Sequence, residues 1–178
     1  MNATDFLKSQ HREVEQLFKT IETSSGVTKT NLVKELAANL AAHMRIEEEL
    51  VYPLAKEFDE DGEMEAMEEH NVAAYTIKRL AGVGIDDATA DAKLKVLKDL
   101  IAHHVKEEET MLLPKLERGI GPARNEALGV QCKKRFDEIK ATGYGGALFD
   151  KPTRTTKNGK DAKGKNAKDG EGAGLLSR

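Results

Sequence analysis

Two stretches of this 178-residue chain repeat one pattern: HMRIEEELVYP at residues 43–53 and HVKEEETMLLP at residues 104–114. Each stretch begins with histidine, has glutamate at its fifth position and ends with proline, and the two align without a gap. On a helix, residues four apart lie one turn apart on the same face, with Cβ atoms about 5–6 Å from each other. Each stretch therefore places an imidazole beside a carboxylate.

The repeat extends to the residues upstream of the two stretches. His11 precedes His43 by 32 residues, and His70 precedes His104 by 34 residues. The chain thus contains two copies of a unit in which a helix with one histidine is followed by a helix with His-x-x-x-Glu. A pseudo-twofold axis between the two copies would bring four imidazoles and two carboxylates together.

The apolar residues around these positions predict four long helices, because they recur every three or four residues. The predicted helices cover residues 4–23, 28–58, 63–81 and 87–116. Their expected core-facing residues are Leu7, Val14, Leu17, Phe18, Ile21, Val33, Leu36, Leu40, Leu50, Leu54, Met67, Ala74, Ile77, Leu80, Leu94, Leu97, Ile101 and Met111. Short connections between long helices favour an all-α, up-down-up-down four-helix bundle. Only 4% of the residues are aromatic and 33% are charged, which argues against a β-sandwich.

The remainder of the chain divides at two points. Residues 1–118 are expected to form the bundle, and residues 119–149 a short fifth helix that Pro122 opens and that packs on it. Residues 150–178 contain eight basic and four acidic residues and few large apolar ones, so we expect a disordered tail. A weak contact with nucleic acid is the alternative for this tail; the net charge of −3 argues against nucleic-acid binding by the whole molecule.

The histidines and glutamates of the repeat fill gaps in the apolar faces, so they are predicted to be buried. Burying a carboxylate without a positive partner costs several kcal/mol of free energy. This cost is comparable to the net free energy of unfolding of many domains, so such a carboxylate needs a positive partner. Six ligands are too many for one tetrahedral zinc and suit two metal ions bridged by carboxylates. The predicted ligands are His11, His43, Glu47, His70, His104 and Glu108, with one metal on the first two histidines, the other on the last two, and both glutamates bridging. Nitrogen and oxygen ligands without sulfur favour two iron ions over manganese or zinc, and each ion would keep an open position.

The neighbouring residues receive simpler interpretations. His103 lies off the apolar face and is expected at the surface or just outside the centre. Tyr52 and Tyr75 are expected to pack against the ligand helices, with contact to the centre as the alternative. Cys132 is expected to be a buried, unreactive thiol, and one cysteine fits a reducing compartment. The remaining acidic residues of the repeat, expected to form a solvated face, are Glu48, Glu49, Glu107 and Glu109, and the methionines Met44, Met67 and Met111 are expected in the core.

The combined pattern of four histidines and two glutamates resembles the hemerythrin-like (HHE cation-binding) family over residues 3–116, and the opening MNATDFLKSQH is similar to the bacterial, actinobacterial type. This resemblance implies a four-helix bundle around a non-haem di-iron centre. In oxygen-carrying members a fifth histidine lies one turn after that of the third helix, where this chain has Ala74, and the last pair is His-x-x-x-x-Asp. For the bacterial type the resemblance implies catalase-like peroxide breakdown, O2 or NO sensing, or iron handling.

Two functions are therefore expected, in order. Two neighbouring irons with open positions favour hydrogen peroxide breakdown; the alternative is an O2- or NO-binding sensor or storage protein without turnover. A ferritin-like oxidase is disfavoured because its helices carry Glu-x-x-His. The expected partners are H2O2, O2 and NO. No apolar stretch reaches the ~20 residues of a membrane span and no signal peptide is visible, so we expect no membrane partner and a cytoplasmic location.

Overall fold

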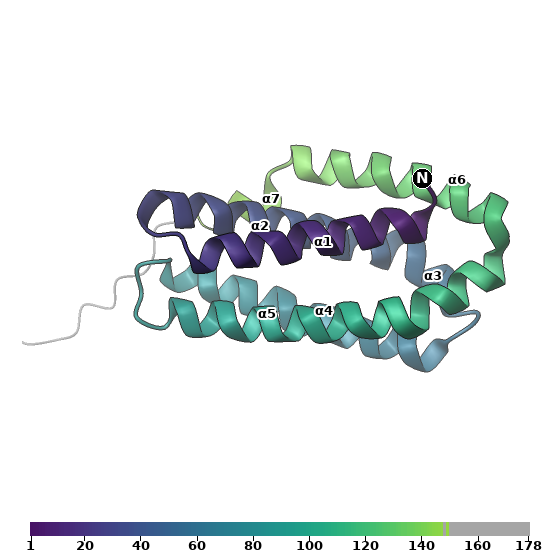
Figure 1. Cartoon of the computed structure of the whole chain (residues 1–178), viewed down its shortest axis with the longest axis horizontal. Helices are drawn as coiled ribbons and strands as arrows, with labels where there is room; N and C mark the ends of the chain where they lie inside the picture. Colours follow the sequence, from purple (N-terminus) through teal and green to yellow (C-terminus); the bar gives the residue numbers. More distant parts are fainter. Residues whose placement is uncertain (148, 150–178) are drawn as a thin grey trace, which may run out of the picture.

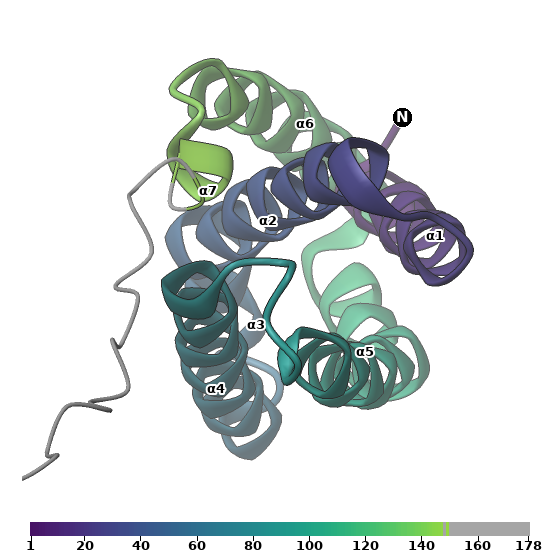
Figure 2. The same cartoon turned by 90° about the vertical axis from the view of Figure 1, so that its left-hand side faces the viewer.

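The computed structural model describes residues 1–147 and 149, and these residues form helices and no strand. Four long helices run antiparallel to their neighbours: α1 (Ala3–Glu22), α2 (Gly26–Ile46), α4 (Glu60–Val83) and α5 (Ala90–Glu107). Seen end-on they surround one interior, whereas α6 and α7 lie outside it, against α2 (Figures 1 and 2). The predicted all-α four-helix bundle is confirmed. The predicted tail, residues 150–178, lies outside the described residues.

The side chains of Asn2 and of the distant Asn125 hold the start of α1. Asn2 is the N-cap, and its side-chain oxygen accepts a hydrogen bond from the Asp5 amide at 2.8 Å. The Asn125 side chain, from α6, accepts from the Ala3 amide at 3.0 Å and the Thr4 amide at 3.3 Å. These bonds satisfy amide groups that a helix leaves without partners at its first turn.

Both helices that contain His-x-x-x-Glu widen directly after the histidine turn. The π segments η1 (Glu47–Val51) and η2 (Glu108–Leu112) each begin at the glutamate, and the short α3 (Tyr52–Ala55) and the long α6 (Leu113–Ala141) follow. Each segment closes with a bond that spans five residues: the Tyr52 amide donates to the Glu47 carbonyl, and the equivalent bond closes η2. A proline follows each bond, and its ring pushes away the carbonyl four residues earlier, which favours the wider turn.

The π turns correct the predicted core. A π turn contains one more residue than the α pattern allows, so the buried positions after each glutamate shift by one. Met111, predicted to be buried, is 53% exposed, and Leu112 is buried in its place. In the same way Val51 is fully buried, whereas the predicted Leu50 is only partly buried. On α4 the prediction of Ala74 is also wrong, because the buried face contains Ala73 instead.

The Gly119–Pro122 segment redirects the chain as the fifth helix begins. Gly121 has φ 75° and ψ 168°, a left-handed conformation that favours glycine. From Pro122 onward α6 turns back and packs against α1 and α2 (Figure 1). The short α7 (Tyr144–Ala147) packs on α2. The fifth helix ends at Ala141. The division of the chain into units at residues 118 and 149 stays a prediction.

The core consists of two apolar clusters. One includes Leu7, Ile46 and Leu116, and the other includes Phe18 and Leu97. On α1 and α4, and from α5 to η2, the histidines and Glu108 lie between residues of the two clusters, whereas on α2 the two clusters meet around His43. The apolar layers thus enclose one polar layer across the middle of the bundle. Within the described residues, no helix combines the length and apolar character that a membrane crossing requires.

Candidate metal centre

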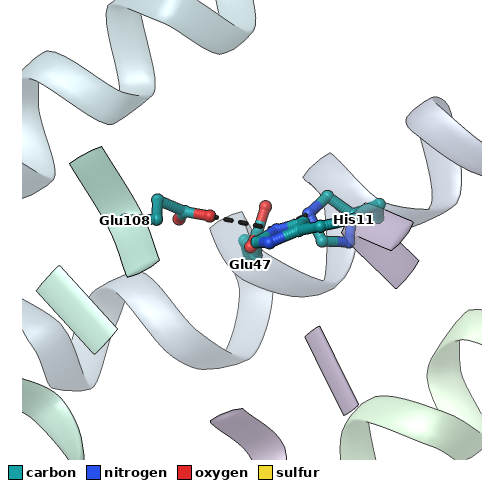
Figure 3. A group of neighbouring side chains, drawn as sticks. His11, Glu47 and Glu108 are labelled. Atoms are coloured by element: carbon teal, nitrogen blue, oxygen red, sulfur yellow. Dashed lines mark hydrogen bonds and ion pairs between the residues drawn. The ribbon is translucent and has the colours of Figure 1, made fainter. Parts of the chain in front are cut away.

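All six predicted ligand side chains meet in this polar layer. Glu47 is 0% exposed and Glu108 is 1% exposed, and the four histidines are also buried. The side chains come from α1, from the α2–η1 junction, from α4 and from the α5–η2 junction. Figure 3 shows three of them, His11, Glu47 and Glu108, pointing toward one another from separate segments. The structure thus brings together the residues that the repeat singles out.

The four imidazoles form two pairs. The Nε2 atoms of His11 and His43 lie 3.1 Å apart, and those of His70 and His104 lie 3.2 Å apart. One pair comes from α1 and α2 and the other from α4 and α5, as the internal repeat predicts. Each pair is the product of one copy of the repeat.

Each glutamate contacts both imidazole pairs. Glu47 Oε1 lies 3.2 Å from Nε2 of His43, and its Oε2 lies 3.3 Å from Nε2 of His70. Glu108 uses a single oxygen, Oε2, which lies 3.4 Å from Nε2 of His11 and 3.5 Å from Nε2 of His104. Both carboxylates therefore stand between the pairs, where a bridging ligand would be placed.

Three carboxylates orient the outer nitrogens of the imidazoles. Nδ1 of His11 lies 2.8 Å from Glu109, and Nδ1 of His104 lies 2.8 Å from Glu69. Nδ1 of His70, on α4, lies 3.3 Å from Glu48. An imidazole that donates its Nδ1 hydrogen to a carboxylate directs its Nε2 lone pair at whatever lies inside. Facing lone pairs 3.1–3.2 Å apart repel each other unless a cation or a proton lies between them.

These carboxylates were not predicted. The prediction that Glu48 and Glu109 belong to a solvated face is wrong, and Glu69 was not singled out. Their one sequence signal is that each directly adjoins a residue of the centre. The helix rotation that turns such a neighbour inward depends on packing between helices, which the sequence pattern does not specify.

Tyr52 is part of the centre's surroundings, whereas Tyr75 is not. The Tyr52 hydroxyl donates to Oε1 of Glu108 at 3.0 Å and lies 3.1 Å from Nε2 of His70. Burial, together with Glu108 and Glu47, raises the pKa of Tyr52 well above its usual value, so the hydroxyl keeps its hydrogen. The packing role predicted for Tyr52 is incomplete, and that for Tyr75 is wrong because it is 62% exposed.

Several buried polar atoms of the centre have no hydrogen-bond partner among the described residues. They are both carboxylate oxygens of Glu47, Oε2 of Glu108 and Nδ1 of His43. Nearby imidazoles lie within ion-pair distance of the oxygens, but not with the geometry of a hydrogen bond. An unsatisfied buried polar atom costs about 1–3 kcal/mol. Oxygens without partners that face imidazole lone pairs are suited to hold cations.

The pKa values show how strongly these groups interact. Burial lowers the pKa of His70, but contacts with Glu47 and Glu48 outweigh burial and raise this pKa to about 9. Burial alone dominates at His43, whose pKa is lowered. Burial would raise the pKa of Glu47, but His43 and His70 hold it well below its usual range. The two buried glutamates therefore require positive charge at their side, from protons or from metal ions.

The family model for the hemerythrin HHE cation binding domain matches residues 2–116. This chain belongs to that family. The HHE domain covers α1 to the start of α6 and contains all six residues of the centre. Membership supports a cation site at the His/Glu groups of the bundle interior.

Two other proteins are similar to this HHE chain. A crystal structure of a hemerythrin HHE cation binding domain-containing protein from Mycobacterium kansasii superposes with a TM-score of 0.73 at 23% sequence identity, covering 80% of this chain and 89% of that one. A protein described as a DNA nickase, from Nostoc sp., is 23% identical over 153 residues, which cover 82% of this chain and 44% of that protein. The HHE chain therefore spans less than half the length of this relative.

Proposed function

We propose that this HHE protein holds two metal ions, foremost iron, on His11, His43, Glu47, His70, His104 and Glu108, and that the loaded centre breaks down hydrogen peroxide. The observation that supports the metal proposal most strongly is the set of buried carboxylate oxygens without hydrogen-bond partners that face four imidazole Nε2 atoms. Imidazole and carboxylate ligands without sulfur suit iron and manganese.

The contacts suggest how the ligands divide. His11 and His43 would hold one ion, and His70 and His104 the other, because each pair directs two Nε2 atoms at one point. Glu47 can bridge with both oxygens. Glu108 has only Oε2 available, because Oε1 accepts the hydrogen bond from Tyr52. Tyr52 thus determines which oxygen of Glu108 is available to a metal ion.

A small apolar cavity offers a place for a small molecule beside the imidazoles. It has a volume of about 10 Å³ and is lined by all four histidines of the centre and by Val14, Leu40, Met44, Ile101 and Val105. A cavity of this size holds about one water-sized molecule. Peroxide, O2 and NO are small enough to enter with a modest shift of the side chains, and larger substrates are excluded.

A groove between α1 and α5 leads from solvent toward this cavity. The groove has a volume of about 570 Å³ and shares His11, Val14, Ile101 and Val105 with the cavity. Four basic side chains line it: Arg12, Lys19, Lys98 and Lys106. Val14, Ile101 and Val105 line both the groove and the cavity, so a small neutral molecule that passes from one to the other would contact apolar side chains.

Peroxide breakdown suits a pair of metal ions because it moves two electrons at a time. One H2O2 accepts two electrons and two protons and becomes two waters, and a second H2O2 loses two electrons and two protons and becomes O2. A pair of iron ions held by the six ligands would supply the two electrons for the first reaction and accept the two from the second. The protein would keep both ions close through the bridging carboxylates and keep the imidazoles oriented through Glu48, Glu69 and Glu109.

The test uses the full chain loaded with iron. We expect about two irons per chain by metal analysis, and O2 evolution from added H2O2 at an oxygen electrode. His70→Ala should abolish O2 evolution, whereas Asn71→Ala, an exposed position directly after it on α4, should not change it. A fully loaded protein that evolves no O2 would refute the peroxide proposal and leave the metal proposal standing.

The second candidate function is binding of O2 or NO without turnover, and the small apolar cavity favours it because such a cavity suits a neutral diatomic molecule. The reduced, iron-loaded protein would then change its optical spectrum reversibly with NO or O2 and evolve no O2 from peroxide. Peroxide turnover that continues over many cycles would rule against this candidate. The cytoplasmic location and the absence of nucleic-acid binding remain predictions.

A further inference from the structure

A second group of possible metal ligands lies outside the centre, on the outer side of α4 and α5. Nε2 of His103 lies 3.4 Å from a carboxylate oxygen of Glu69 and 3.4 Å from one of Glu107. One ligand atom from each residue lies within 4.8 Å of the others. The His103 side chain is 56% exposed, so solvent reaches this group directly. None of the buried centre's six residues belongs to it.

The spacing of these atoms fits a small divalent cation. Ligands 2.1 Å from a tetrahedral metal ion are about 3.4 Å from each other, since a tetrahedral edge is about 1.6 times the bond length. The two distances at His103 equal this value. The outer group offers one imidazole and two carboxylates, and the buried centre also consists of imidazoles and carboxylates. The same kind of cation could therefore bind at both places.

Glu69 connects this outer group to the buried centre. Its Oε1 faces His103, while its Oε2 accepts a hydrogen bond from Nδ1 of His104 at 2.8 Å. The Nε2 atom on the other side of the His104 ring faces the interior. A cation held at the outer group would thus lie one carboxylate and one imidazole ring away from the buried ligands.

A cavity joins the two places independently of this contact. It has a volume of about 110 Å³, and its lining includes Glu69 and Glu107 of the outer group as well as His104 and Glu108 of the centre. Glu108 is 1% exposed, and its Oε2 has no hydrogen-bond partner among the described residues. Glu108 thus lines the acidic cavity and also faces His11 and His104 of the centre through Oε2, so a cation that passes along the cavity would reach the buried ligands.

The charge of this cavity differs from that of the α1–α5 groove. The carboxylates that line it are Asp59, Glu65, Glu69, Glu107 and Glu108, and no lysine or arginine lines it among the described residues. Asp59 is paired with Lys115 at 2.6 Å, so the other four carboxylates give the cavity its negative charge. The α1–α5 groove, in contrast, is lined by four basic side chains and by two acidic ones, Glu15 and Glu109. Acidic walls raise the local concentration of cations and speed their association. The acidic cavity therefore suits the entry of cations, and the α1–α5 groove suits the entry of small neutral molecules.

We propose that Glu69, His103 and Glu107 form a capture site for a divalent cation, which then passes through the acidic cavity to the buried centre. The proposal rests on the proposed function only in that the buried centre is the destination. Exposed His103 and Glu107 bind the hydrated ion first. Glu69, which already contacts the centre, is the ligand that remains in place as the ion moves inward.

The test follows uptake of Co²⁺ alone by the metal-free full chain. The double variant His103→Ala/Glu107→Gln removes two surface ligands without altering a buried side chain. Glu68→Gln is the matched control, because it removes the same charge from an exposed position beside Glu69. Equilibrium dialysis counts the bound ions, and stopped-flow absorbance of the cobalt bands gives the rate at which the buried ions bind.

We expect three bound ions in wild type and in the control, and two in the double variant, with buried-site uptake slowed on the order of tenfold, the low end of electrostatic steering. Wild type with two ions and unchanged uptake in the double variant would overturn the capture site and leave the centre standing; the outer group would then be a surface ion-pair cluster. If the wild type bound one ion and the double variant bound none, the result would refute the buried centre and support the outer site.

Discussion

Replacing Glu47 by glutamine tests the centre most directly, because the effect should appear only when metal is present. Glu47 is the one residue that belongs to both buried ligand groups, and its two oxygens face different imidazole pairs. Glutamine has the same shape but no charge, and its nitrogen cannot act as a second ligand. Glu47→Gln should therefore weaken binding of both ions, whereas Glu108→Gln, in only one of the groups, should weaken binding less.

The size of the effect follows from linkage between binding and folding. An ion present at 100 times its dissociation constant stabilises the folded state by about 2.7 kcal/mol, so two ions contribute about 5.4 kcal/mol. For a chain of this length, each kcal/mol raises Tm by about 2–4 °C. Saturating metal should thus raise the Tm of the wild type by roughly 11–22 °C, and that of Glu47→Gln by only a few degrees.

Differential scanning calorimetry with and without Mn²⁺ measures this increment. Mn²⁺ avoids oxidation during the scan. The exposed Glu126→Gln on α6 is the control for a lost carboxylate and should keep the full increment. An equal increment in wild type and Glu47→Gln would show that the ions bind elsewhere. No increment in the wild type would show that protons alone neutralise the buried glutamates.

Three further predictions concern single groups around the centre. Tyr52→Phe leaves Oε1 of Glu108 without its donor, and should cost about 1–3 kcal/mol of unfolding free energy in urea; a change below 0.5 kcal/mol would contradict the hydrogen bond. The pKa of His70, raised to about 9, lies above its unfolded value, so its proton stabilises the metal-free protein below about pH 6.5, and this stabilisation is lost as pH rises through 9. Metal added at pH 7 should therefore displace this proton, which a weakly buffered indicator dye detects, and release fewer protons above pH 9. Burial raises the pKa of Cys132 to about 12, so its thiol should resist alkylation at pH 8 in the native protein and react fully in denaturant; rapid native alkylation would show that α6 opens readily.

The candidate ligands were the most predictable part of the molecule. A buried carboxylate is costly, so polar residues at core positions of four helices already indicate a shared site. The duplication of His-x-x-x-Glu, as at His43 and Glu47, also indicates which residues act together. The four-helix fold follows from the same pattern, because it is the arrangement in which these faces can meet.

The sequence pattern was misleading where helix geometry departs from 3.6 residues per turn. The regular pattern predicted a buried Met111, but the π turn that begins at Glu108 shifts the buried position to Leu112. The prolines that promote this turn are visible in the sequence. Whether a proline produces a kink, a break or a π turn depends on how the neighbouring helices pack.

The sequence by itself determined which side chains must be buried together, because the repeated spacing and the free energy of burying charge are both local properties. Only the tertiary structure decided what surrounds them. Glu69 orients His104 and faces the outer group, and Tyr52 holds Glu108, because the rotation and offset of neighbouring helices bring these groups within 3.4 Å. Those contacts join residues 35 and 56 positions apart in the chain, and no periodicity along one helix encodes them.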